Sequence, residues 1–375
     1  MDKPTLQKIL RQHKDELFQE LNLPYFQIKA LKKLSVCRTA ELGGHAEYCE
    51  NGHLDGVWYN SCRHRSCPQC QNLAKAQWLE NTQRILLNCP HHHVIFTIPH
   101  ELHELWRHNR AQMADLLFQA AQQTLKIFAD DAKYLGAKPG ILSALHTWGR
   151  NLALHPHLHV LISHGGLDIN GSWVIPKKDT LFPQKPVMMT FRGKLLSLIR
   201  SALEAEQWTL PEGRGVPQIK SLLNALGRKD WTVHFCNQYV HGKGVAKYLA
   251  RYVKGGVFNN DQIKTHENGQ VRFLYKSHQS QRYEWLRLAT GEFVRRVAEH
   301  VLPLRKCGVR YAGLYSPSCR DKLNQARQQL GQEPLADKVQ LHWEVWLEGL
   351  GHIRQCRHCQ GELVIRKAIV RDWQN

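Results

Sequence analysis

Acidic residues and long apolar stretches are scarce in this 375-residue sequence. Its 32 Asp and Glu face 51 Lys and Arg, so the formal net charge is +19 with histidine neutral. No apolar run reaches the roughly 18 residues of a membrane-spanning helix, and the N-terminal segment has no apolar signal-peptide core. Internal repeats and low-complexity segments are also absent. These absences predict a cytoplasmic protein without a membrane partner.

Hydrophobic residues are abundant enough for a folded protein. They make up 42% of the chain, which includes 11 Trp, so a disordered basic tail is excluded. The positive charge predicts a polyanionic partner, because Lys and Arg release condensed counterions when they bind phosphates. Charge alone does not separate nucleic acid from an acidic membrane surface.

Apolar periodicity and breaker residues predict a mixed α and β fold. Helices are expected within 2–33 (two short ones) and over 71–88, 101–128, 191–207, 245–253, 290–301 and 318–330. Strands are expected over 93–99, 140–148, 154–163, 231–240, 271–277 and 308–316. The second and third of these strands are separated only by Gly149-Arg150-Asn151, which predicts a hairpin.

The segment LHPHLHVLI, residues 154–162, places three histidines at alternate positions of a strand. His155, His157 and His159 therefore point to one face, and the aliphatic residues between and after them serve the other. Burying several imidazoles without a partner is costly, so this pattern favours a metal-ligand cluster over a set of structural histidines. A further ligand is expected from a neighbouring strand. His146 is the first choice, and Gln238 and His234 are alternatives.

The segment GKGVAKYLARYVKGG predicts a short helix with Tyr248 and Tyr252 one turn apart on the same face. A core stripe of aliphatic residues and a basic side of Lys247, Arg251 and Lys254 border these tyrosines. On its own, the helix is also compatible with two aromatic residues that close it against a sheet. Beside a metal ion and cations, however, a phenol can attack a phosphodiester.

Five of the 11 cysteines crowd into residues 37–70 among histidines, a stretch with few periodic apolar residues. Such clustering is typical of metal ligation in a reducing compartment. The candidate zinc ligands are Cys37, His45, Cys49, His53, Cys62, His64, Cys67 and Cys70. They predict one or two structural zinc ions, which would position Arg38, Arg63 and Arg65 on DNA. Cys356-Arg-His-Cys359 near the C-terminus is either a further site with His352 or His358, or an exposed thiol pair.

Several of these motifs, in this order, resemble the IS91 family of rolling-circle transposases, which are two-tyrosine HUH single-strand endonucleases. The similar segments are LGGH and YNSCRHRSCPQCQ, then HTWGRNLALHPHLHVLISHGG, KYLARYV, EFVRRVAEHVLP and RYAGLYS. The resemblance spans about residues 30 to 325. It implies an α+β fold: an HUH core with an antiparallel sheet flanked by helices, an N-terminal zinc-binding domain and a small helical C-terminal tail with a Cys pair.

The same resemblance implies the site chemistry. His157 and His159 would hold Mg²⁺ or Mn²⁺, with His146 as the candidate third ligand, and Tyr248 and Tyr252 would be the nucleophiles. Each tyrosine would attack single-stranded DNA at a transposon end or target and give a 5′-phosphotyrosine and a free 3′-hydroxyl. The enzyme would be bacterial and nucleoid-associated.

The sequence departs from the family pattern at three positions. His146 stands where Gln is usual, Gly52 where relatives carry Cys, and Ser66 where they often carry His; His53 and His64 can substitute as zinc ligands. A phosphate-binding GxxxxGK[ST] loop is also absent, so no ATP-driven helicase is fused to this chain. Strand separation would come from a host helicase, from replication proteins or from the DNA itself.

These predictions divide the chain into four segments. N-terminal helices are expected over 1–34, the zinc-binding domain over 35–75, the nuclease domain over 76–315 with 167–230 as an insertion or extension, and the tail over 316–375. Two other functions fit the same motifs: a zinc-containing regulator that binds DNA or RNA, and a plasmid or phage replication initiator with the same nuclease chemistry. Residues 243–320 hold 15 Lys and Arg against 5 Asp and Glu, which predicts a phosphate-binding track through the tyrosines.

Overall fold

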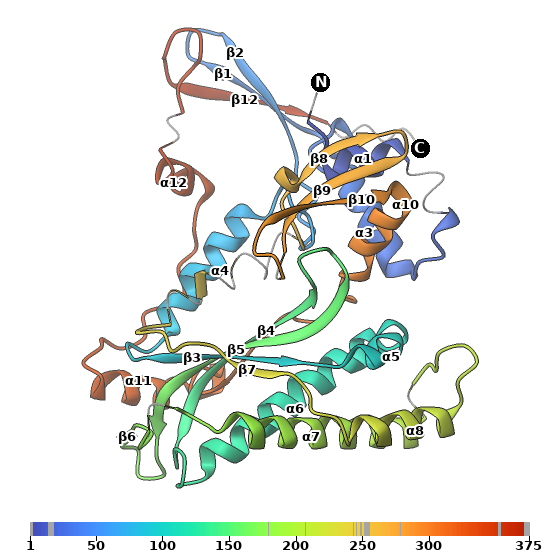
Figure 1. Cartoon of the computed structure of the whole chain (residues 1–375). Coiled ribbons are helices and arrows are strands. Elements are labelled where there is room, and N and C mark those ends of the chain that lie inside the picture. Colours follow the sequence, from blue (N-terminus) through green and yellow to red (C-terminus); the bar gives the residue numbers. More distant parts are fainter. Residues whose placement is uncertain are drawn as a thin grey trace.

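The computed structural model describes most of the chain (Figure 1). The described residues are 3–13, 19–178, 180–206, 208–242, 244, 246, 247, 250, 256–277, 279–351 and 354–370. Within these ranges, three antiparallel sheets and the helices around them form an α+β fold, which confirms the predicted fold class. In this part of the chain, every helix is too short or too polar to cross a membrane.

The largest sheet lies in the lower half of Figure 1 and has the strand order β11-β4-β5-β3-β7, with β6 paired to β5. Its strands are β3 (His91–Thr97), β4 (Lys138–Trp148), β5 (Leu154–Leu167), β6 (Trp173–Val174), β7 (Val233–Phe235) and β11 (Val309–Gly313). The long strands β4 and β5 form the predicted hairpin, and all neighbours in the sheet are antiparallel. This hairpin carries the histidine motif.

Helices cover one face of this sheet. They are α5 (His103–His108), α6 (Arg110–Asp130), α7 (Gln184–Glu204) and α8 (Val216–Leu226). Strand alternation sends Val94, Phe96, Leu158 and Val160 to this face, where they are buried among helix side chains. The Phe96 ring lies 4.9 Å from that of Phe191 on α7. Burying one such side chain contributes about 1.5–3 kcal/mol. This layer holds the largest cluster of buried apolar residues and is therefore the main apolar core.

The opposite face of the same sheet is only partly apolar. Helices α4 (Asn72–Ile85) and α11 (Arg320–Gln329) pack over one part of it, together with Tyr315. The Tyr315 ring fills the space beside Gly140, where an added Cβ would lie 2.5 Å from it. Its hydroxyl is 2.5 Å from His91 Nε2 and accepts the backbone N–H of Leu87. The remaining part of this face carries polar residues.

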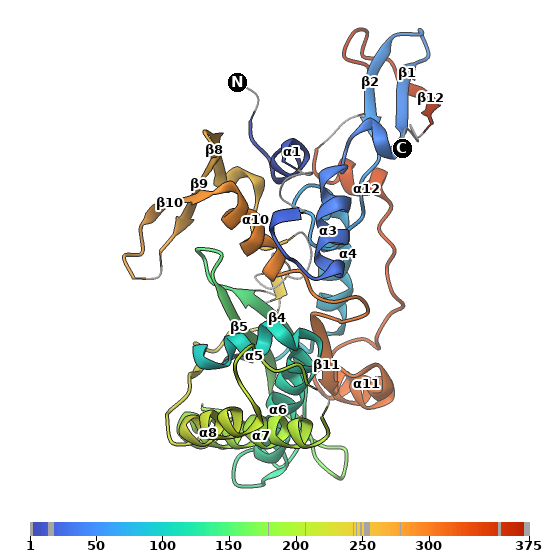
Figure 2. The ribbon, with the colours of Figure 1, turned by 90° about the vertical axis from the view of Figure 1, so that its right-hand side faces the viewer.

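The N-terminal helices pack against a second sheet from the C-terminal half of the chain (Figure 2). This unit comprises α1 (Leu6–Gln12), α3 (Tyr25–Ser35), β8 (Ile263–Glu267), β9 (Gln270–Lys276), β10 (Tyr283–Ala289) and α10 (Thr290–Glu299). Leu10 and Leu31 share its core with Phe273 and Phe293, all fully buried or nearly so. The Gln27 side chain donates to the Ala298 carbonyl at 2.7 Å. Residues about 270 positions apart thus form one core.

A third, small sheet stands at the top of Figure 1 and has the order β12-β1-β2. It comprises β1 (Gly44–Cys49), β2 (Leu54–Tyr59) and β12 (Leu363–Ile369), with α12 (Trp343–Glu348) nearby. The chain reaches it from α11 along α4, where Gln77 accepts the Leu341 N–H at 2.6 Å and Asn81 donates to the Val339 carbonyl. The C-terminal segment is therefore part of the sheet that follows α3.

Most predicted helices and strands are present, and three differences have clear causes. The expected helix over 101–128 breaks at Asn109, whose side chain bonds both backbone groups of Thr209. The expected strand over 231–240 pairs regularly only at Val233–Phe235, with one further bridge between Tyr239 and His91. Sequence patterning also missed α8, which has a proline in its first turn, and β8, which is short and mostly polar. The strands β1, β2, β10 and β12 were not expected either.

Candidate functional site

Three buried histidines meet on the polar part of the large sheet. His146 lies on β4 directly opposite His157 on β5, and His159 follows two residues later on the same face. One ring nitrogen from each lies within 4.8 Å of the others. The Nε2 atoms of His157 and His159 are 3.1 Å apart. The hairpin register therefore makes His146 the third member of the cluster, as predicted.

Hydrogen bonds behind the cluster orient two of its rings and set the tautomer of His157. His157 Nδ1 is 2.6 Å from the carbonyl oxygen of His155, which only accepts, so Nδ1 carries the proton and Nε2 presents its lone pair. His159 Nδ1 is 2.7 Å from Nε2 of His93 on β3. When His159 donates this bond, its Nε2 also presents a lone pair to the cluster. Such outer partners are typical of histidines that bind metals.

His93 lies directly behind the cluster, and the sequence motifs did not point to it. The signal was present, because the run His91-His92-His93 begins a strand and places every second residue on one face. Pairing between β3 and β5 sets Ile95 opposite His159, which brings His93 alongside it. Sequence spacing alone did not indicate that β3 is the neighbour of β5.

Burial favours the neutral form of three histidines, His146 and His159 of the cluster and His93 behind it. Desolvation lowers the pKa of His93 to about 4, and it lowers the pKa of His146 and His159 well below the ordinary value. Neighbouring histidines act in the same direction, since a second positive charge would repel the first. Neutral imidazoles are the form that ligates metals, so the site is ready to bind a cation without losing protons.

The donor set of the cluster fits a divalent ion. Two nitrogens bound at about 2.1 Å to one ion would lie roughly 3.0–3.4 Å apart, which matches the separation of His157 and His159. His155 is exposed and outside the group, as is His234 on β7. The side chain of Gln238 instead lies 3.5 Å from His92. Of the predicted candidates, His146, His157 and His159 are thus the ones brought together.

Most of the predicted tyrosine helix lies outside the described residues, including Tyr248, Arg251, Tyr252 and Lys254. Ala246, Lys247 and Ala250 are described and helical, and the Ala246 N–H bonds to the Gly242 carbonyl at 3.0 Å. Ala246 is fully buried in the apolar cluster that includes Leu161 of β5, while Lys247 is exposed. This part of the segment therefore packs on the histidine-bearing face of the large sheet.

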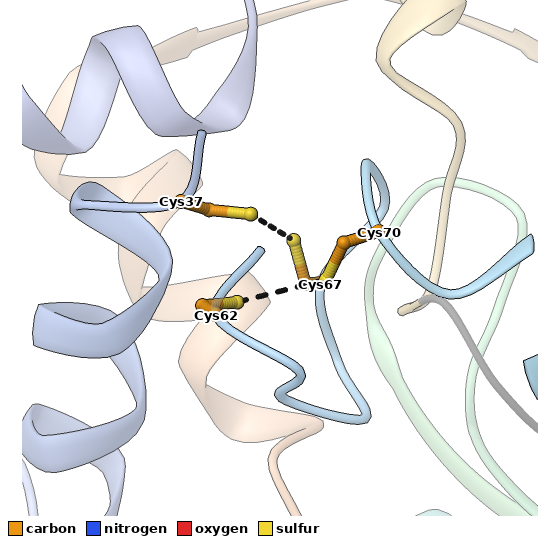
Figure 3. Close-up of side chains that lie close together, drawn as sticks. All are labelled: Cys37, Cys62, Cys67 and Cys70. Atoms are coloured by element: carbon orange, nitrogen blue, oxygen red, sulfur yellow. Dashed lines mark hydrogen bonds between the residues drawn. The ribbon is translucent and has the colours of Figure 1, made fainter. Parts of the chain in front are cut away.

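Four cysteines come together in a second group of candidate metal ligands (Figure 3). Cys37 follows α3, and Cys62, Cys67 and Cys70 lie in the loop that leads into α4. The Sγ atoms of Cys37 and Cys67 are 3.5 Å apart, and those of Cys62 and Cys70 are 3.8 Å apart. Sulfurs bound to one tetrahedral zinc at 2.3 Å would be separated by about 3.8 Å. Because these four sulfurs converge from two segments, they are suited to a closed structural zinc site.

Of the three arginines expected to lie on DNA (Arg38, Arg63 and Arg65), Arg65 is engaged within the protein. The Arg65 guanidinium donates to the carbonyls of Leu302 at 2.7 Å and Pro303 at 2.9 Å, and burial lowers its pKa. It therefore ties the zinc loop to the segment after α10. Arg63 is exposed, and Arg38 donates to the Tyr59 carbonyl.

The eight predicted zinc ligands separate into different environments. His45 lies outside both cysteine groups, with its Nε2 3.7 Å from Glu47. His64 also lies outside them, and its Nδ1 accepts the Ser66 N–H while burial lowers its pKa to about 4. Cys49 and His53 belong to another group, whose other members are Cys356 and Cys359 of the C-terminal segment.

Comparisons with known proteins agree with both groups of residues. A family described as "Putative transposase" matches residues 140–322, and one described as "Transposase zinc-binding domain" matches residues 9–98. The chain is 33% identical to "Putative transposase y4qJ" of Sinorhizobium fredii over 92% of its own length and 90% of the relative. It is 32% identical to "Transposase for insertion sequence element IS801" of Pseudomonas savastanoi pv. phaseolicola, over 79% of this chain and 72% of that protein.

The first family covers the β4–β5 hairpin with its three histidines, and the second covers the four cysteines before α4. The first of the two relatives matches 92% of this chain, more than the two family matches cover together. Fold, sites and relatives thus point the same way: this chain belongs to the IS91 family of transposases and carries an N-terminal zinc-binding domain with a four-cysteine cluster.

Proposed function

We propose that this transposase nicks and rejoins single-stranded DNA at the ends of its insertion sequence by metal-dependent attack of a tyrosine, in rolling-circle transposition. The observation that carries the proposal is the buried cluster of His146, His157 and His159 on the sheet face against which Ala246, from the segment that contains Tyr248 and Tyr252, is buried. A cluster with ring nitrogens this close is suited to one catalytic cation rather than to a structural role.

The histidines and the tyrosines have separate roles in this reaction. The three imidazoles would hold Mg²⁺ or Mn²⁺, and the ion would polarise the phosphoryl oxygens of the scissile phosphate. The phenol oxygen of Tyr248 or Tyr252 forms a bond to phosphorus, and the bond from phosphorus to the 3′ oxygen breaks. The phenol proton ends on the released 3′-hydroxyl. The product is a 5′-phosphotyrosine, which a 3′-hydroxyl attacks in the reverse sense to rejoin the DNA.

Basic residues complete the proposed site. Lys247, Arg251 and Lys254 share the segment with the tyrosines, and Lys247 is exposed. Their charges would bind the DNA backbone and offset the charge that develops on the phosphate. Single-stranded DNA of the ends and the target is the proposed substrate, and strand separation is assigned to host proteins. Both relatives are described as transposases, which favours a transposase over a replication initiator or a zinc-containing regulator.

Covalent trapping tests the proposal. The full chain is incubated with Mn²⁺ and single-stranded oligonucleotides of the two element ends, labelled at the 3′ end. We expect a labelled protein that resists denaturation, because cleavage leaves the downstream fragment attached through its new 5′ phosphate. Peptide mapping should place the nucleotide on Tyr248 or Tyr252. Bound DNA that never becomes attached, with either Mn²⁺ or Mg²⁺, would contradict the proposed function.

A further inference from the structure

The group made by Cys49, His53, Cys356 and Cys359 joins the two ends of the chain. Cys49 ends β1 and His53 lies in the turn before β2, whereas Cys356 and Cys359 precede β12. The four ligand atoms lie within 4.8 Å of one another. We propose that these residues form a second zinc site, which fastens the C-terminal strand β12 to the N-terminal hairpin.

The distances within this group match a tetrahedral zinc site. The sulfurs of Cys49 and Cys359 are 3.7 Å apart, and Cys49 Sγ is 3.5 Å from His53 Nδ1. Tetrahedral zinc, with bonds of about 2.3 Å to sulfur and 2.05 Å to nitrogen, would separate these pairs by about 3.8 and 3.5 Å. The agreement for both kinds of pair indicates one ion between three sulfurs and one imidazole.

The backbone around Cys356 repeats a feature of the four-cysteine cluster. The His358 N–H points at Cys356 Sγ at 3.4 Å, as the His64 N–H points at Cys62 Sγ at 3.5 Å. Asn51 also donates to Cys359 Sγ at 3.5 Å. Donors aimed at sulfur stabilise the thiolate form that binds zinc. Both clusters are therefore built in the same way.

The small sheet has little else to hold it together. Among the described residues of its strands and the turn before β12, the buried hydrophobic residues are Ala46, Cys49 and Cys356. Ion pairs from buried Glu47 to Arg354 and Arg366 also cross between hairpin and tail, but the cost of desolvating the carboxylate offsets much of their attraction. A three-stranded sheet without an apolar core is marginal in water. A metal ion supplies the missing stabilisation.

Zinc content measures this site directly. Full-length protein carrying His157→Ala, which removes the histidine cluster from the count, should contain two zinc ions per chain by mass spectrometry. Adding Cys356→Ser/Cys359→Ser should leave one, and Cys67→Ser/Cys70→Ser should also leave one. The matched control Cys307→Ser/Cys319→Ser, at isolated cysteines, should keep two. Two ions in the Cys356→Ser/Cys359→Ser protein, or one in the His157→Ala protein, would overturn the proposal.

Thiol alkylation of the unaltered protein gives a test that does not depend on how the variants fold. In the zinc-loaded protein, Cys49, Cys356 and Cys359 should react at least about tenfold more slowly than the exposed Cys307. A zinc chelator should make all three reactive together. Equal reaction of Cys359 and Cys307 before chelation would contradict a zinc site.

A different observation concerns the outer face of the second sheet. On this face Tyr283 lies opposite Lys276, Trp285 opposite Leu274, and Arg287 opposite Arg272. Trp285 is 54% exposed and Tyr283 71% exposed, and the Arg272 guanidinium lies 4.5 Å from the centre of the Trp285 ring. We infer that this face is a stacking surface for single-stranded DNA, which rests on the proposed function and extends it.

Charge and position support this occupant. Both β9 and β10 are fully described, and Glu284 is the one acidic residue in these two strands. Its side chain lies on the other face of the sheet and accepts a hydrogen bond from the Tyr275 hydroxyl. On β9 and β10 the outer face therefore combines aromatic rings with positive charge, the combination that binds single strands without sequence preference, while Glu267 on the edge strand β8 lies opposite Gln270. At its end, Arg150 from the β4–β5 turn donates to the Lys276 carbonyl at 3.2 Å. Figures 1 and 2 both show this turn beside β10, so the surface leads toward the histidine hairpin.

Affinity for an oligothymidine of about 20 nucleotides tests the stacking surface. Trp285→Ala should weaken binding about tenfold, and the double variant with Tyr283→Ala further, because each base stacked on a ring is lost. The matched control is Tyr25→Ala, an exposed aromatic on α3 that should leave affinity unchanged. Unchanged affinity in the double variant would overturn the inference.

The same variants separate this inference from the proposed nuclease. If the double variant binds DNA weakly while the unaltered protein forms no covalent adduct, the stacking surface stands and the nuclease proposal fails. If the adduct forms and the double variant binds normally, the reverse holds.

Discussion

Replacing both Tyr248 and Tyr252 by phenylalanine is expected to lower the yield of the covalent protein–DNA adduct by at least about 10⁴-fold. Phenylalanine keeps the ring and its packing but has no oxygen to bond to phosphorus. Removing a nucleophile eliminates the covalent route entirely, so the loss should approach the detection limit. The measurement is the adduct assay with Mn²⁺ and labelled end oligonucleotides.

Affinity separates loss of chemistry from loss of binding in this experiment. Single-strand affinity of the double variant should stay within about twofold, because phosphate contacts supply most of it. The control is Tyr239→Phe, at a half-exposed tyrosine that bridges to β3 near the histidines, and it should react normally. Each single variant should retain an adduct through the other tyrosine. A double variant that still forms an adduct would show that neither residue is the nucleophile.

Local spacing explains why much of the site was predictable. His157 and His159 share a face because strand residues alternate, and a short turn brings His146 opposite His157. The four cysteines of the zinc-binding domain stand within 34 positions of each other, so their clustering is visible along the chain. In each case, the residues that meet stand within a few dozen positions of each other along the chain.

Contacts between distant segments were not predictable in the same way. Cys49 and His53 were among the candidate zinc ligands, but Cys356 and Cys359, which they meet, lie more than 300 positions later. His93 was missed for a similar reason, because the positions of the strands along the chain do not show that β3 is the neighbour of β5. The tail was expected as a separate segment over 316–375, yet its strand β12 pairs with β1. Only the folded chain shows which half-sites meet.

The positive charge of residues 243–320 is divided between structure and surface. Lys306 and Arg310 both pair with Asp115 of α6, and they hold the pKa of that carboxyl below its ordinary value. Arg272 and Arg287, in contrast, lie on the outer face of the second sheet. The net charge therefore predicted a polyanionic partner, whereas only the folded chain shows which Lys and Arg side chains are left to bind it.

Replacing His157 by alanine is expected to slow strand cleavage by at least about a thousandfold while single-strand affinity stays within about twofold. The imidazole is one of three proposed ligands, and a bound ion supplies several kcal/mol of stabilisation to the phosphoryl transition state. At 1.36 kcal/mol per tenfold, a loss of about 4 kcal/mol corresponds to this change. Calorimetric titration with Mn²⁺ should show weakened binding in the absence of DNA.

His157 is the most informative ligand to remove, because its second ring nitrogen bonds the nearby backbone carbonyl of His155. Removing His159, in contrast, would also take the hydrogen-bond partner, at 2.7 Å, from buried His93. His146→Gln is the matched control: the amide oxygen can still ligate, so Mn²⁺ binding and cleavage should fall by less than about tenfold. The melting temperatures of both variants should lie close together. If His157→Ala cleaves as fast as His146→Gln with both proteins folded, the histidine cluster is not the catalytic metal site.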